Sequence, residues 1–186
     1  MEPPILTTER LVTRMAEPRD VPRVVAYFRD QQAFLAPFSP RRPPGFITEA
    51  YWHERIAQSL DDFNADRAMR LFLFDRAAGN VLGTCSFTQI ERGPAQYCVL
   101  GFGLSEGHQG RGLMAEALRP AIGYAFEALE IHRIGANYMP HNRRSGRLLR
   151  RLGFVVEGYA RDYLLINGRW EDHVLTSLTN PQHSRG

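Results

Sequence analysis

The pattern of hydrophobic and polar positions along the chain predicts both helices and strands. Helical spacing is clearest where apolar residues occupy positions 113, 114, 117, 118, 121, 122, 125 and 126. Such spacing gives a helix one buried face. It predicts helices over residues 17–30, 48–64, 111–129 and 141–152. Runs rich in β-branched and aromatic residues predict strands over residues 10–15, 70–75, 81–90, 96–105 and 131–139.

Local signals mark where these elements begin and end. Thr48 is a candidate N-cap, and Gly153 is a natural helix stop. Residues 34–46 ("FLAPFSPRRPPGF") predict a loop, because proline disfavours helix at its own position and at the preceding one. Pro120 is expected to bend its helix. Two strands are predicted within 154–178, on either side of an Asn-Gly pair typical of a tight hairpin.

The order of elements predicts the fold class. Short turns between the three successive strands favour antiparallel neighbours. Residues 99–105 and 132–139 flank a long helix, so they can pair in parallel through a crossover. The sequence therefore predicts an α+β, mixed α/β protein around one strand–loop–helix–strand unit. No repeat or long linker divides residues 1–186, which indicates one domain with a core over about 6–180 and a short tail at 181–186.

Composition narrows the function classes. A 44% hydrophobic content suffices for a sizeable core, and no signal peptide or apolar run of membrane-spanning length is apparent, so a cytoplasmic protein without a membrane partner is expected. Cys85 and Cys98 lie within apolar runs and are expected to be core thiols. No histidine or cysteine has metal-ligand spacing, so no metal is predicted. The net charge of +3 does not by itself indicate nucleic-acid binding.

The stretch "HQGRG" at residues 108–112 joins a predicted strand to a predicted helix. Free N–H groups and the helix dipole make such a start a potential anion site, and glycine lets the backbone approach a phosphate. A glycine turn without a ligand is the alternative. The spacing matches neither the dinucleotide fingerprint nor the P-loop. What remains is the pattern Gln109-x-x-Gly112-x-Met114.

This pattern resembles the pyrophosphate loop of the GNAT acetyltransferases, which use acetyl-coenzyme A. The stretches "TTERLVTR", "NRRS", "LGF" and "INGRWEDHVL" extend the resemblance over about residues 6–180, and "HRIGANYMPHNRRSG" with "EGYARDYLLINGRW" is similar to the Rim branch, which acetylates ribosomal proteins. The resemblance implies the GNAT fold. In that fold a central, mostly antiparallel twisted sheet has a parallel pair at the coenzyme A cleft and is flanked by helices.

The resemblance also implies roles for individual residues. Glu157 is the implied general base, and Ser145 is implied to hydrogen-bond the departing thiolate. Asn142 can cap its helix and contact the pantetheine arm. The implied acetyl-coenzyme A contacts are Leu104, Gln109, Gly110, Arg111, Gly112, Leu113, Met114, Asn142 and Ser145. Leu149 is a departure, because many relatives place a tyrosine there to protonate the thiolate.

The implied acceptor is an N-terminal α-amine, on alanine of a small-subunit ribosomal protein. A terminal amine is neutral more often than lysine at physiological pH. Residues 34–46 and the Asn167-Gly168 turn are expected to wall the peptide cleft, with Arg41 and Arg42 favouring acidic stretches. An arginine face at positions 143, 147 and 150 is solvated by default, and can otherwise steer coenzyme A or contact RNA. The alternatives are a GNAT enzyme for a small amine or antibiotic, and a non-catalytic acyl-coenzyme A-binding or ribosome-assembly module.

Overall fold

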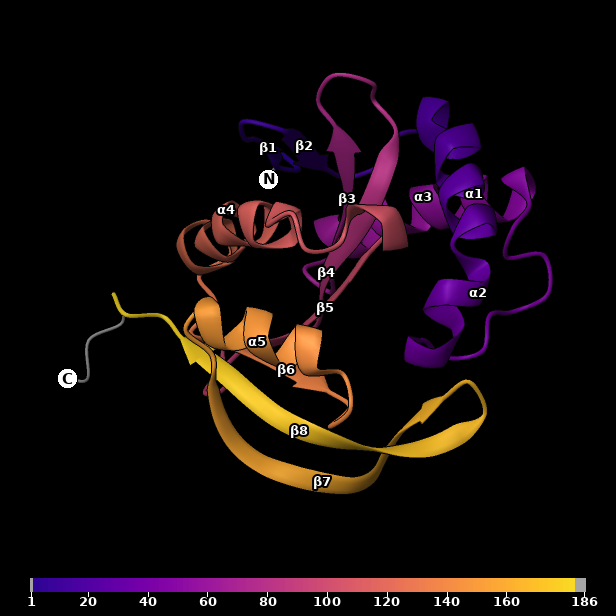
Figure 1. The fold of residues 1–186 in the computed structure, drawn as a ribbon. Helices are drawn as coiled ribbons and strands as arrows, with labels where there is room; N and C mark the ends of the chain where they lie inside the picture. The colour runs from indigo at the N-terminus through magenta and orange to yellow at the C-terminus, as the bar shows by residue number, and fades with distance from the viewer. Residues whose placement is uncertain (1, 183–186) are drawn as a thin grey trace.

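One eight-stranded sheet forms the centre of the computed structural model, which describes residues 2–182 (Figure 1). Its order is β1-β2-β3-β4-β5-β6-β8-β7. The strands are β1 Ile5–Thr7, β2 Leu11–Arg14, β3 Met69–Asp75, β4 Val81–Glu91, β5 Tyr97–Leu104, β6 Arg133–Tyr138, β7 Val155–Ile166 and β8 Arg169–Thr179. Residues 183–186 of the expected tail lie outside the described residues.

The pair β5–β6 is parallel, and all other neighbouring strands are antiparallel. The predicted mixed sheet with one parallel pair is thereby confirmed. Pairing between β5 and β6 covers only the register from Tyr97–Arg133 to Val99–Gly135. Beyond it, β5 continues to Leu104 and β6 to Tyr138 without pairing to each other. The sheet therefore splits at the carboxyl ends of these two strands.

Helices cover both faces of the sheet. They are α1 Val21–Asp30, α2 Gln32–Leu35, α3 Glu49–Asn64, α4 Leu113–Glu127 and α5 Arg143–Arg151, with 3-10 turns at Pro18–Asp20, Ala36–Phe38 and Glu106–His108. Side chains alternate along β3: Leu71 and Leu73 join the core beneath α4 and α5, whereas Phe72 and Phe74 join the core beneath α1 and α3. Figure 1 shows α4 and α1 on opposite sides of the central strands.

Most predicted elements are confirmed, one predicted loop is corrected in part, and one short strand was not predicted. Residues 34–38 are helical, because α2 continues into the 3-10 turn Ala36–Phe38. Pro37 sits in the first turn of that 3-10 helix, where its missing N–H costs no hydrogen bond. The strand β1 was not predicted, because three residues are too few to show a periodic signal. Thr48 caps α3 by accepting a hydrogen bond from the Tyr51 N–H at 3.3 Å, as predicted.

The predicted hairpin is also confirmed. Asn167 and Gly168 both have positive φ, at 47° and 85°, which the tight turn between β7 and β8 requires. Its tip lies beside the segment after α2, since the Asn167 N–H donates to the Ser39 carbonyl at 3.0 Å (Figure 1). The guanidinium of Arg41 packs against Gly168 at this tip. Two segments far apart in sequence therefore meet across the sheet.

Both cysteines lie in the core, as predicted. Burial raises the pKa of each thiol to about 12, which keeps them protonated and unreactive. Among residues 2–182, no helix is long and apolar enough to span a bilayer. The same residues contain no group of three His, Cys, Asp or Glu side chains placed to hold a metal ion.

Candidate acetyl-coenzyme A and acceptor cleft

A cleft of about 690 Å³ opens where β5 and β6 separate. One wall is β5 from Gly101 to Leu104, with Thr84 and Ser86 of the neighbouring strand. The loop before α4 and the first turns of α5 form a second wall. A third wall comes from α1 and the segment that follows it. Because β5 has lost its β6 partner here, every second peptide group of this strand faces the cleft instead of a neighbouring strand.

The "HQGRG" loop forms the end of the cleft at the start of α4. Gly110 and Gly112 have φ of 76° and 79°, a left-handed conformation that favours glycine. Gly112 is the N-cap of α4, so the N–H groups of the first helical turn point out of the helix start beside it. The positive end of the helix dipole adds to them. This geometry suits a phosphate group, as the sequence predicted.

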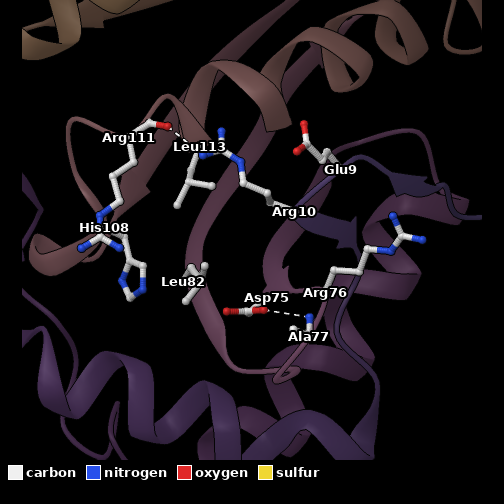
Figure 2. Close-up of a pocket in the computed structure, with 9 residues that line it drawn as sticks. All are labelled: Glu9, Arg10, Asp75, Arg76, Ala77, Leu82, His108, Arg111 and Leu113. Carbon is white, nitrogen blue, oxygen red and sulfur yellow. Dashed lines mark hydrogen bonds between the residues drawn. The ribbon is translucent and has the colours of Figure 1, made fainter.

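The turn between β1 and β2 holds this helix start in place. Glu116, in the first turn of α4, accepts hydrogen bonds from the Thr8 hydroxyl at 2.6 Å and from Arg10 Nε at 2.8 Å. Burial alone would raise the pKa of Glu116, but these hydrogen bonds outweigh it and the pKa is lowered. Arg10 also donates to the Arg111 carbonyl at 3.0 Å (Figure 2). The stretch "TTER" therefore anchors the loop, a role that sequence reasoning missed.

The Arg111 side chain lies outside the cleft. It lines a separate hollow behind the loop with Arg10, Arg76 and His108 (Figure 2). The other proposed cofactor contacts line the cleft, namely Leu104, Gln109, Gly110, Gly112, Leu113, Met114, Asn142 and Ser145. The structure thus brings together residues from β5, the loop and α5 that are separated by up to 41 positions in the sequence.

Helix α5 presents polar and cationic groups to the cleft. Asn142 caps it by accepting a hydrogen bond from the Ser145 N–H at 3.2 Å, so the predicted cap is confirmed. Arg144, Arg147 and Arg151 line the cleft, while Arg143 and Arg150 of the predicted arginine face do not. Arg144 donates a hydrogen bond to Gln109 across the opening. Leu149 is 1% exposed in the core, and its neighbour Leu148 lines the cleft instead.

Glu157 lies away from these residues. It sits on β7 at an irregularity in the β7–β8 register, and its carboxylate pairs with Arg133 at the start of β6. The hydrogen bond from Arg133, and a second one from Ser177, lower its pKa. Glu157 is not among the residues that line the cleft, whereas Glu106 is the one carboxylate among them. The two proposed catalytic residues are therefore not in direct contact.

Several cleft residues had no sequence signal. Tyr27 and Phe28 come from α1, and Phe34, Phe38 and Arg42 come from the segment expected to wall the peptide cleft. Thr84 and Ser86 face the same space from β4. The residues of α1 and β4 look like ordinary amphipathic-helix and strand positions in the sequence, whereas residues 34–46 were predicted to wall the cleft. Arg41 packs on Gly168 at the hairpin tip and is not among the cleft residues.

Comparison with known proteins identifies the family to which this architecture belongs. Residues 10–155 match the family model described as the acetyltransferase (GNAT) domain. The chain belongs to the GNAT acetyltransferase family. The prediction of a GNAT fold and of an N-acetyltransferase is confirmed.

Three relatives of this GNAT chain are informative. The [ribosomal protein uS5]-alanine N-acetyltransferase of Escherichia coli (strain K12) is 44% identical over 181 residues, covering 97% of this chain and 93% of that protein. The crystal structure of ribosomal-protein-S5-alanine acetyltransferase from Vibrio fischeri has a TM-score of 0.93 at 34% identity, with 97% and 99% coverage. Mycobacterium smegmatis RimJ in complex with CoA-disulfide has a TM-score of 0.86 at 22% identity, over 100% of this chain and 93% of that one, which supports the fold.

Proposed function

We propose that this protein transfers an acetyl group from acetyl-coenzyme A to the N-terminal alanine of a small-subunit ribosomal protein. The 44% identity to an enzyme named for alanine acetylation of uS5, over nearly the whole of both chains, carries this proposal. The cleft supports it, because one space holds both a phosphate-binding helix start and an open wall of aromatic and polar groups. Two substrates can therefore meet where the sheet divides.

The cofactor end of the cleft is proposed to bind coenzyme A in three ways. The N–H groups at the start of α4 take the pyrophosphate. The cleft-facing peptide groups of β5, together with Asn142, hold the amides of the pantetheine arm. Arg144, Arg147 and Arg151 supply positive charge near the phosphates, and the Arg144–Gln109 contact opens or shifts to admit them. Acetyl-coenzyme A is a co-substrate here, and no metal takes part in the proposal.

The proposed chemical step is a direct transfer. The lone pair of the neutral α-amine forms a C–N bond to the thioester carbon, the C–S bond breaks, and coenzyme A leaves as a thiolate. The amine nitrogen loses one proton and the sulfur gains one. Ser145 lines the cleft on α5 and is proposed to hydrogen-bond the thiolate. Leu149 cannot protonate the thiolate, because it is buried and its hydrocarbon side chain has no acidic proton to donate.

The base is proposed to be Glu157 acting through water. Its lowered pKa keeps it ionised at physiological pH, although Arg133 also makes it a weaker base. An α-amine has a pKa of about 7.7–8.0, so a weak base suffices. Glu106 is the rival carboxylate, since it lines the cleft.

Two matched variants test which of these two carboxylates is the general base. We expect Glu157→Gln to lower kcat about 10²-fold at pH 7, because general base catalysis contributes roughly 10²- to 10⁴-fold. The loss is expected to shrink above pH 8, where the amine deprotonates unaided. Glu106→Gln is expected to retain kcat. Steady-state kinetics from pH 6 to 9 measures both, and the reverse ranking would assign the base to Glu106.

The acceptor is tested with a panel of peptides read by mass spectrometry. Peptides beginning with alanine are offered beside peptides with a blocked terminus and an internal lysine, and beside a polyamine and an aminoglycoside. We expect acetylation at the alanine α-amine, with release of free thiol. Preference for lysine or for the small amines would overturn the acceptor while retaining the GNAT assignment. Binding of acetyl-coenzyme A without thiol release on any acceptor would indicate a non-catalytic module.

A further inference from the structure

The Tyr27 hydroxyl is a buried polar group without a hydrogen-bond partner among residues 2–182. Tyr27 is 5% exposed on α1, and its side chain lines the cleft. Burial raises the pKa of this phenol, so the hydroxyl stays neutral and keeps its proton to donate. Buried hydroxyls nearly always have a partner, because leaving one unpaired destabilises the fold. Thr13 Oγ1 is also buried and unpaired, but Thr13 is not a cleft residue. Because Tyr27 does line the cleft, a ligand bound there can supply the partner that its hydroxyl lacks.

Arg42 interacts electrostatically with the Tyr27 phenol, and both residues line the cleft. Its guanidinium is held over the rings of Phe28 and Phe46, at 4.9 and 4.5 Å from their centroids, and Nη1 donates to the Phe28 carbonyl at 3.2 Å. No ion pair of Arg42 with a carboxylate occurs in the described part of the chain. Burial lowers the pKa of Arg42, and an arginine guanidinium remains charged in proteins. A rigidly held cation thus retains unused donors in the cleft.

We propose that Tyr27 and Arg42 form a subsite that binds the first backbone carbonyl of the acceptor peptide. Both side chains are donors, and a peptide carbonyl oxygen has two lone pairs, so one oxygen can accept from both. The carbonyl of the first residue is separated from the α-amine by a single carbon. Holding it therefore orients the amine toward the thioester. The subsite deepens the proposed function, because it rests on an N-terminal peptide being the acceptor.

The charge of the cleft supports a peptide over a polyamine. Its lining residues include Arg42, Arg144, Arg147 and Arg151, against the single carboxylate of Glu106. With coenzyme A bound, Arg144, Arg147 and Arg151 face its phosphates, so Arg42 is the cation that repels a polyamine. A polyamine also has no carbonyl to occupy the two donors. A peptide terminus presents one amine and a series of carbonyls. The subsite therefore selects peptide amines among otherwise similar nucleophiles.

The test is Tyr27→Phe, which removes the hydroxyl and keeps the ring. We expect the KM for an alanine-initiated peptide to rise about tenfold, with the KM for acetyl-coenzyme A unchanged. The melting temperature of the free protein should stay equal or rise, because an unpaired buried polar atom is removed. Arg42→Gln should raise the peptide KM in the same way. The matched control is Tyr51→Phe, which removes a hydroxyl from the same aromatic cluster outside the cleft.

An acceptor without a carbonyl completes the test. Spermidine at high concentration serves as the probe, and Tyr27→Phe should leave its kcat/KM unchanged. An unchanged peptide KM in the folded variant, an equal loss for spermidine or for Tyr51→Phe, or a rise in the acetyl-coenzyme A KM would each overturn the subsite. Failure of the wild-type enzyme to acetylate any peptide terminus would instead reject the proposed function, so the two failures are distinguishable.

Discussion

Individual charged residues inside the fold are held by arginine, and Asp20 is the most buried example. Its carboxylate is 0% exposed and accepts from Arg14 at 2.7 and 3.0 Å and from the Glu17 N–H at 2.8 Å. Burial acts to raise the pKa of Asp20, but the hydrogen bonds from Arg14 and Glu17 outweigh it, and the pKa is lowered. The pair joins β2 to the start of α1, and α1 carries Tyr27 into the cleft.

This lowered pKa predicts an acid-dependent loss of stability. A carboxylate with a lower pKa in the folded state stabilises the protein above its unfolded pKa of about 3.9, and that contribution disappears as the pH falls through the folded value. Asp20→Asn should therefore lower the free energy of unfolding by about 3 kcal/mol at pH 7, because Arg14 loses its closest and fully buried charge partner. The difference from wild type should narrow at pH 3. Urea unfolding at both pH values measures it.

The control for this prediction is Asp61→Asn. Asp61 is exposed on α3, where a surface substitution changes stability by no more than about 0.5 kcal/mol. An Asp20→Asn cost that is equal at pH 3 and pH 7 would show that the hydrogen-bond geometry, and not the charge, stabilises this junction.

At the scale of elements, the split between β5 and β6 creates the cleft, and glycines on β5 keep it open. A Cβ on Gly101 would meet nothing within 4 Å, although Gly101 lines the cleft and has an ordinary strand conformation. Valine suits a strand better than glycine does, so Gly101→Val should leave the melting temperature equal or higher. Its side chain should nevertheless occupy substrate space and lower kcat/KM about 10²-fold.

A graded series tests this separation of stability from activity. Gly101→Ala should give an intermediate loss of kcat/KM, because it adds one methyl group. Gly123→Ala on α4 is the control, since a Cβ there also meets nothing within 4 Å and Gly123 is not a cleft residue. Full activity of Gly101→Val, measured by thiol release, would show that substrates do not pass this part of β5.

At the scale of the whole molecule, one sheet contributes side chains to both hydrophobic cores and also forms a wall of the cleft. Acetyl-coenzyme A is expected to contact β5, α4 and α5 together, so its binding should stabilise the native state as a whole. At a concentration 100 times its Kd the gain is about 2.7 kcal/mol. Thermal unfolding should therefore shift upward with acetyl-coenzyme A and stay unchanged with NAD at the same concentration. An equal shift with NAD would contradict the coenzyme A assignment.

Local signals in the sequence determined most of the helices and strands and also the loop at the coenzyme A end of the cleft. The apolar run of β3, the periodic face of α4, the Asn167-Gly168 turn and the glycines of the 108–112 loop each act over a few residues. Backbone conformation and burial pattern depend on near neighbours, so these features can be read without knowing the fold. The resemblance of the loop to the GNAT pattern then indicated coenzyme A.

Tertiary structure alone decided which side chains share the cleft. Tyr27 reaches it because α1 covers the same split edge of the sheet that α5 reaches from the other side, and there it joins Arg42 of the segment after α2. Arg10 and Glu116 anchor the loop from 106 positions apart, and Arg133 pairs with Glu157 outside the cleft. The register between β5 and β6 ends after Val99–Gly135, and no periodicity in either strand marks that point. Such contacts depend on how distant segments pack. Local sequence patterns therefore determined the helices and strands, and only the tertiary structure determined which distant residues contact one another.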